Sequence, residues 1–253
     1  MSASFATQVL GWRKLKNSEK FVPNSADSDS RVSTELARII LEKLGVPHNQ
    51  IIEGAPDNMG PELERKVKDN LSESLNLADP SRLWHVERHQ KISGFLQYAH
   101  LGKVKEIVEE YPVLSADLGV DYLIDPDVTI GVEQSADSFS VGHPFLHAAV
   151  SCKWTIRSDR VQNVRHEFLQ MIRHRRGRLP HLVTVTAEPV PSRIAAIARG
   201  TGEVDAVYHV AFHALQEAVD AVGSTQQRRD LGECISQGRL RPYEDLVPTL
   251  ITW

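Results

Sequence analysis

Hydrophobic residues recur at helical spacing in some stretches of the chain and gather in short apolar runs in others. In residues 58–77, Leu63, Val67, Leu71 and Leu75 follow one another every four positions, which predicts one buried helix face. A helix before it is predicted to begin at a cap formed by Ser33 and to end at Gly45. The predicted helices cover residues 33–44, 58–77, 90–110, 159–175, 192–198 and 211–222.

Apolar, β-branched runs between these helices predict strands at residues 84–87, 122–132, 145–156 and 180–186. The first half of 145–156 is almost continuously apolar and is expected to be buried on both faces. Pro126 cannot donate to a strand neighbour, which places it at an edge or a bulge. Residues 204–210 fit a strand or the start of the next helix, and the chain beyond Arg228 is weakly patterned.

Strands that alternate with helices predict an α/β fold with a central mixed β-sheet flanked by α-helices. We predict a single domain over residues 1–253. Its parts are an N-terminal helical part (about 1–115), a central core (about 116–222) and a C-terminal segment (223–253).

Composition is that of an ordinary globular protein, with 41% hydrophobic residues and a net charge of −4. Two cysteines, Cys152 and Cys234, cannot build a disulfide framework or a Cys-x-x-Cys metal site. The chain has no apolar run of the roughly 18–20 residues that cross a membrane, and its first residues lack the pattern of a secretory signal. We therefore expect a cytoplasmic protein with no membrane partner.

Positive charge is concentrated in one stretch of this acidic chain. Residues 153–178 contain eight Lys and Arg side chains against two acids, Asp159 and Glu167. A local basic stripe of this kind predicts a confined site for a polyanion rather than a general affinity for one.

An acid and a lysine stand near the ends of two neighbouring apolar runs. Asp127 is placed at the end of one apolar run, and Lys153 lies at the end of the next. Carboxylates can hold Mg²⁺, and a lysine can contact a phosphate and orient or activate water, as phosphodiester hydrolysis requires. Ser151 and Lys153 would share one strand face, with Cys152 offering its backbone carbonyl. An Asp-Pro turn and a solvated strand end give the same pattern, and Asp125 competes with Asp127.

The segment that follows, Arg157-Ser158-Asp159-Arg160, offers two forked donors around one acceptor. An arginine fork suits the N7 and O6 of guanine, and a carboxylate suits the N4 amino group of cytosine. An N-capping aspartate between two solvated arginines would look the same.

The run Ser151 to Arg160 (SCKWTIRSDR), followed by Gln162 and Asn163, closely resembles the core of the NgoMIV-type type IIF restriction endonucleases. The resemblance covers most of the chain and is strongest from about 97 to 210. Further segments that resemble the family are 97–101, 177–181, 186–189, 191–194 and 200–203.

This resemblance implies a restriction-endonuclease-like PD-(D/E)XK core in which a serine replaces the second acid of the motif. It implies Asp127 as the metal-binding acid, Ser151 and Lys153 as the strand pair, and Glu167 as the relocated acid on the following helix. Mg²⁺ is the implied cofactor, with Asp127, Glu167 and the Cys152 backbone carbonyl as its ligands. A further family acid aligns best with Glu64, although Glu62 lies close by.

For base recognition, the resemblance assigns Arg157, Asp159 and Arg160 to a central CCGG. Arg193 and Asp27 match the positions that read the outer G·C pair of GCCGGC. A glutamine that joins these two residues in the family falls on or near Asp57 here. An aspartate cannot donate to guanine, so another six-base site around CCGG is the alternative to GCCGGC.

The implied function is a type II restriction endonuclease that cuts double-stranded DNA to leave 5′ four-base overhangs. The implied partners are a second dimer, giving a dimer of dimers (a homotetramer), and a cognate DNA methyltransferase. A palindromic site itself predicts at least a two-fold symmetric dimer. The alternatives are a DNA-binding protein that has lost catalysis and a repair nuclease that recognises DNA structure. A nuclease that recognises structure would not need side chains such as Arg157, Asp159 and Arg160 that are suited to base edges.

Overall fold

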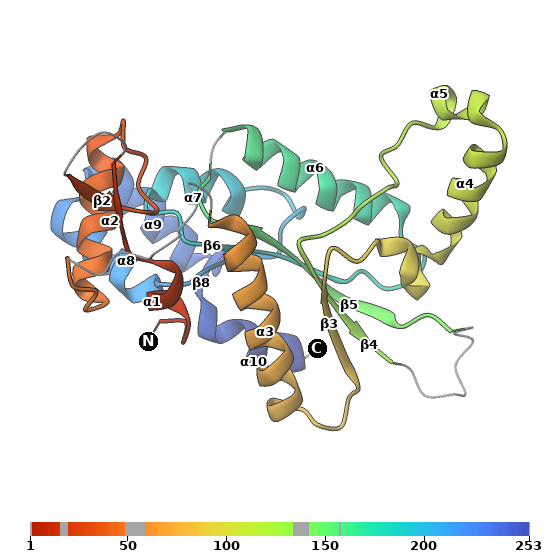
Figure 1. Cartoon of the computed structure of the whole chain (residues 1–253), viewed down its shortest axis with the longest axis horizontal. Helices are drawn as coiled ribbons and strands as arrows, with labels where there is room; N and C mark the ends of the chain where they lie inside the picture. Colours follow the sequence, from red (N-terminus) through yellow and green to blue (C-terminus); the bar gives the residue numbers. More distant parts are fainter. Residues whose placement is uncertain (1, 16–19, 49–58, 134–141, 157, 253) are drawn as a thin grey trace.

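A mixed six-stranded sheet lies at the centre of the computed structural model, which describes residues 2–15, 20–48, 59–133, 142–156 and 158–252, with the backbone alone at 158–160 (Figure 1). Its strands are β3 (Trp84–Arg88), β4 (Val128–Val132), β5 (Phe145–Lys153), β6 (His181–Thr186), β7 (Ala206–His209) and β8 (Leu240–Pro242). They stand in that order across the sheet. The pairs β3–β4 and β4–β5 are antiparallel and the pairs from β5 to β8 are parallel. The predicted mixed α/β sheet is confirmed.

Helices flank this sheet, and in Figure 1 α6 and α7 are seen above it and α3 and α10 below it. The α-helices are α1 (Ala6–Val9), α2 (Arg31–Lys43), α3 (Gly60–Ala78), α4 (Ala99–Glu110), α5 (Ser115–Leu118), α6 (Ser158–His174), α7 (Pro191–Ala198), α8 (Phe212–Val222), α9 (Thr225–Ser236) and α10 (Leu246–Thr252). The 3₁₀ turns are η1 (Ile92–Gly94), η2 (Leu96–Tyr98), η3 (Pro112–Leu114) and η4 (Tyr243–Asp245). A separate antiparallel pair consists of β1 (Trp12–Lys14) and β2 (Phe21–Pro23).

The buried face of α3 follows the predicted spacing. Leu63, Val67, Leu71 and Leu75 are all fully buried, and they join a hydrophobic core whose members extend along the sequence from Ala3 to Leu250. Because α3 contacts β3, β4 and β5, it is held against the strands that carry the candidate site. Among the helices of the described residues, none combines the length and the apolar character that a bilayer crossing requires.

Two predicted helices begin elsewhere. The cap of α2 is Ser30, whose hydroxyl accepts the backbone N–H of Ser33, so Ser33 lies inside the helix rather than at its start. The predicted helix 90–110 is wrong in its first part, where η1 and η2 precede α4. Phe95 adopts an extended backbone between those two turns, which is incompatible with a continuous helix.

Two predicted strands are too long. Strand β4 begins only at Val128, so residues 122–127, including Pro126, lie outside it. Strand β5 ends at Lys153, since the Ile156 N–H is hydrogen bonded to the side chain of Glu188 instead of a strand neighbour. Residues 206–209 form β7 and α8 follows it separately, which settles the alternative left open there.

The C-terminal region is more regular than its weak pattern suggested. Ser224 and Gln227 form a reciprocal capping box at the start of α9. Strand β8 then adds a parallel edge strand to the sheet, and α10 packs against α3.

Candidate functional site

The end of β5 and the start of β4 meet at one edge of the sheet. Val128 pairs with Val150 in the antiparallel β4–β5 ladder. Asp127, one residue before Val128, therefore lies beside the residues that follow Val150. The register of this single strand pair brings the acid to Ser151, Cys152 and Lys153.

Three donors converge on Oδ2 of Asp127. The Lys153 Nζ lies 2.7 Å from it, the Cys152 backbone nitrogen 2.6 Å and the Ser151 Oγ 3.3 Å. The side chains of Asp127 and Lys153 are both 20% exposed, so the ion pair is partly shielded but open to a ligand. Asp125 is exposed and takes no part in these contacts, which favours Asp127 as the central acid.

Glu167 reaches the same region from α6. Burial, and after it the negative charge of Asp127, raises the pKa of Glu167 to about 7, against an opposing effect of the Lys153 ammonium. Its Oε1 is buried and, among the described residues, has no hydrogen-bond partner. A buried carboxylate oxygen without a donor, next to a second carboxylate, is an arrangement that a bound cation would relieve.

These residues fit a hard divalent cation such as Mg²⁺, which takes oxygen ligands and commonly only one or two carboxylates. Across the part of the chain that the structure describes, no three His, Cys, Asp or Glu side chains stand together as a metal site. Backbone, phosphate and water oxygens would therefore have to complete the coordination around Asp127 and Glu167.

Glu64 on α3 lies close to this edge, whereas Glu62 does not. Glu64 lines a cavity of about 230 Å³ together with Cys152 and Lys153. Its side chain is 13% exposed, and its carboxylate accepts a hydrogen bond from Arg88 Nη2 at 2.6 Å. Glu62 forms an ion pair with Arg65 at the surface. The geometry therefore favours Glu64 of the two acids.

The side chains predicted to read the central bases cannot be placed. Arg157 lies outside the described residues, and Asp159 and Arg160 are described only as backbone in the first turn of α6. Asp57 also lies outside the described residues.

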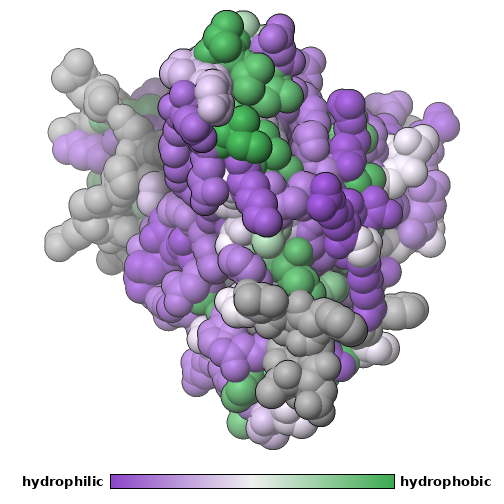
Figure 2. All heavy atoms as spheres, turned by 90° about the vertical axis from the view of Figure 1, so that its right-hand side faces the viewer, coloured by the Kyte–Doolittle hydropathy of each residue, from purple (hydrophilic) through white to green (hydrophobic). Residues whose placement is uncertain are grey.

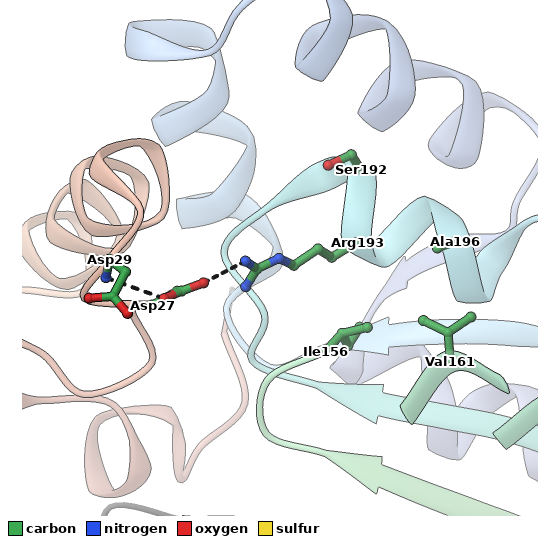
Figure 3. Close-up of a pocket in the computed structure, with 7 residues that line it drawn as sticks. All are labelled: Asp27, Asp29, Ile156, Val161, Ser192, Arg193 and Ala196. Carbon is green, nitrogen blue, oxygen red and sulfur yellow. Dashed lines mark hydrogen bonds and ion pairs between the residues drawn. The ribbon is translucent and has the colours of Figure 1, made fainter. Parts of the chain in front are cut away.

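Arg193 and Asp27 do come together, although they are far apart in sequence. Figure 3 shows the Arg193 side chain extending from α7 towards Asp27, with Nη2 and Oδ2 2.7 Å apart. The two residues line a cavity of about 660 Å³ that also includes Ile156 and Val161. The side chains are 31% and 39% exposed, so both can reach a ligand that enters this cavity.

A fully buried acid, Glu188, lies beside this pair and was not singled out from the sequence. Its carboxylate accepts the backbone N–H groups of Ile156 and Val190 and lies 3.7 Å from Arg193 Nη1. Burial raises its pKa to about 7 in spite of these donors. The sequence signal was only the segment 186–189, because nothing in a sequence shows that a glutamate will be buried.

Comparison with known proteins gives one family and one curated relative. A family model described as "NgoMIV restriction enzyme" matches residues 10–143 and 131–250. The type II restriction enzyme NgoMIV of Neisseria gonorrhoeae is 43% identical over 190 residues. That alignment covers 64% of this chain and 66% of the relative.

Proposed function

Because the chain belongs to the NgoMIV restriction enzyme family, we propose that it is a type II restriction endonuclease that hydrolyses both strands of duplex DNA at a palindrome containing CCGG. The observation that carries this proposal is the convergence of Lys153, Ser151 and Cys152 on Asp127. Lys153 lies only four residues before Arg157 in the sequence. Chemistry on the phosphate and reading of the bases are thereby attached to the same short segment.

Asp127, Glu167 and the Cys152 backbone carbonyl would hold the Mg²⁺ ion. When bound, the ion supplies positive charge against the phosphate and lowers the pKa of water. The unpartnered oxygen of Glu167 and its raised pKa support this assignment, since both are expected of an acid prepared for a cation.

Lys153 would neutralise charge on the scissile phosphate and orient the attacking water. Its ammonium is a compact charge with three donors, and one of them is already held by Asp127 at 2.7 Å. The remaining donors can face a phosphate that enters this edge of the sheet. Ser151 would fix the Asp127 carboxylate, and Glu64 would add a further acid to the same cavity.

Arg157, Asp159 and Arg160 would read the central CCGG, and Arg193 with Asp27 would read the outer pair. Arg193 is suited to guanine and Asp27 to the amino group of cytosine. Without DNA the two side chains satisfy each other. A G·C pair entering the cavity could replace that ion pair by offering an acceptor edge to one residue and a donor to the other. GCCGGC is therefore our first candidate site, with another six-base site around CCGG as the alternative.

We further propose that cleavage leaves 5′ four-base overhangs and that the active assembly is a dimer of dimers. Support for self-association comes from residues 99–123, which we call the arm and which project from the body (Figure 1). Six of the eleven exposed large hydrophobic residues in the described part of the chain lie there: Ile107, Tyr111, Val113, Leu118, Val120 and Leu123. Figure 2 looks onto this side and shows the hydrophobic spheres gathered at its top.

The charges of the arm favour a second copy over DNA as its partner. Two lysines and five acids give the arm a net charge of −3, which disfavours a phosphate backbone. In α4, Lys103 and Lys105 precede Glu106, Glu109 and Glu110. Two copies of α4 packed antiparallel about a two-fold axis would therefore pair opposite charges.

Charging the arm is expected to reduce the size of the assembly. Val113→Asp combined with Val120→Asp, at side chains 78% and 64% exposed, should halve the mass measured by light scattering after gel filtration. Leu77→Asp is the matched control, because Leu77 is 83% exposed on α3, outside the arm. An unchanged mass in the double variant would reject the arm as an interface.

Incubation with plasmid DNA and Mg²⁺ tests the proposed activity. We expect discrete fragments from plasmids that contain the site, no cutting of plasmids without it, and no cutting after chelation of the metal. Binding to CCGG duplexes without any cutting would support the inactive DNA-binding protein. Preferential cutting of a branched duplex over a linear CCGG duplex would support a structure-specific repair nuclease.

A cognate DNA methyltransferase would be the remaining partner, because an endonuclease of this type would otherwise cut the DNA of its own host. Both proteins would then act in the cytoplasm, where that DNA lies.

A further inference from the structure

The short segment between Lys153 and Arg157 joins the proposed catalytic lysine to the proposed base reader. Thr186, the last residue of β6, and Glu188, two residues later, hold its two ends. At one end, the Thr186 hydroxyl donates to the Lys153 carbonyl at 2.6 Å. At the other, Glu188 Oε2 accepts the Ile156 N–H at 2.7 Å. The Glu188 N–H in turn donates to the Thr186 oxygen at 3.1 Å. The segment is thus fixed from outside β5.

The second oxygen of Glu188 faces the other proposed reader. Oε1 accepts the Val190 N–H at 3.1 Å, just before α7 begins, and lies 3.7 Å from Arg193 Nη1. The other terminal nitrogen of the same guanidinium, Nη2, contacts Asp27. Glu188 therefore holds one branch of the Arg193 fork and leaves the second branch pointing into the cavity.

The surroundings of Glu188 are suited to a carboxylate and not to its amide. Its contacts with Ile156, Val190 and Arg193 are all with donors, and a glutamine would turn an NH₂ group towards one of them. The backbone of Glu188 is also fixed, because its carbonyl lies 3.1 Å from His209 Nε2 while His209 Nδ1 accepts the Ala211 N–H. An ionised group placed fully out of solvent is costly unless it is paired in this way.

We infer that Glu188 is a positioning residue that fixes the Arg193 side chain relative to the segment leading to Arg157. The outer and central base pairs can then be read at the same time. This inference rests on the proposed function. Glu188 touches neither the phosphate nor a base in this arrangement. Its effect would pass through Arg193 on one side and through the Ile156 N–H on the other.

The test measures cleavage of four CCGG duplexes that differ only in the outer base pair, in Mg²⁺, for wild type, Glu188→Gln, Arg193→Gln and the double variant. Wild type should prefer one duplex. Glu188→Gln should reduce that preference by roughly 10-fold or more, the scale of one bidentate base contact. In the Arg193→Gln background, adding Glu188→Gln should change the preference by less than about 3-fold, because the coupled contact is already lost.

Asp230→Asn is the matched control. Asp230 is also a buried acid paired to an arginine, with Arg199 Nη2 at 2.6 Å, but at the opposite end of α7. It should leave the preference unchanged. Thermal unfolding is measured for every variant. If Glu188→Gln does not fold, Glu188→Asp replaces it, since a side chain one carbon shorter cannot span Ile156 and Arg193 together.

Equal loss of cleavage on all four duplexes, with the wild-type preference retained, would overturn the inference and leave Glu188 a purely structural residue. If the effects of Glu188→Gln and Arg193→Gln on this preference add in the double variant, Glu188 does not act through Arg193. A wild-type protein that cuts none of the four duplexes would instead reject the proposed function, so the two failures are distinguishable.

Discussion

Lys153→Ala is expected to reduce the rate of DNA cleavage by roughly 10²–10⁴-fold, the usual contribution of a positioned catalytic side chain. The variant removes the donor that lies 2.7 Å from Asp127 and would contact the scissile phosphate. Folding should survive, because Lys153 is not part of the hydrophobic core and Asp127 keeps the Ser151 and Cys152 donors. Binding of a CCGG duplex should also survive, since the proposed readers are untouched.

Single-turnover cleavage, a mobility-shift assay and thermal unfolding measure these three properties separately. Lys43→Ala provides the control, because Lys43 also forms an ion pair with an acid, Glu217, at 2.6 Å, but at the surface between α2 and α8. It should cleave like wild type. A Lys153→Ala variant that retains a tenth or more of wild-type activity would remove Lys153 from the mechanism.

Glu167→Gln is expected to make the metal-free protein more stable above neutral pH while abolishing cleavage. Burial and Asp127 raise the pKa of Glu167 from 4.5 to about 7. Below the ordinary pKa both the folded and unfolded states are protonated, so the group costs nothing. Between pH 4.5 and 7 the folded state binds more protons, so stability falls as the pH rises, and above 7 the full cost is present. The glutamine removes this cost.

The expected gain is on the order of 2 kcal/mol at pH 8, or about 4–8 °C in melting temperature, and close to zero at pH 5. Mg²⁺ should raise the melting temperature of wild type at pH 8, because it binds the charged acids of the folded state, and should do so much less for Glu167→Gln. Glu217→Gln, at the surface, should show neither effect. A wild type that Mg²⁺ fails to stabilise would reject Glu167 as a ligand.

The strand alternation of β5 was enough to predict that Ser151 and Lys153 share a face, because the side-chain period of a strand is two. Their meeting with Asp127 required the β4–β5 register, in which Val128 pairs with Val150. That register depends on a strand start at Val128, two residues after Pro126, which the predicted strand 122–132 did not resolve.

The spacing of hydrophobic residues could not predict contacts between segments that are distant in the sequence. The pairing of Arg193 with Asp27 joins α7 to the loop before α2, and only the family resemblance pointed to it. The burial of Glu188 was not predictable either. Its only signal was its place in the family-like segment 186–189, and a glutamate between a threonine-rich strand and a proline is typical of a solvated turn. The helix predicted over 90–110 failed because Ile92 and Phe95 are buried by two 3₁₀ turns, which place apolar residues three positions apart much as a helix does.

Only three residues separate Lys153 from Arg157, the first residue of the segment proposed to read CCGG, so the bond that is cut should lie at a fixed distance from the bases that are read. Sequencing the ends of every fragment from a digest of DNA with many CCGG sites measures that distance. All ends are expected at one fixed offset from CCGG, with a 5′ four-base overhang, whatever the sequence beyond the six-base site. Ends scattered around CCGG, or at positions without it, would show that cleavage is not coupled to base reading.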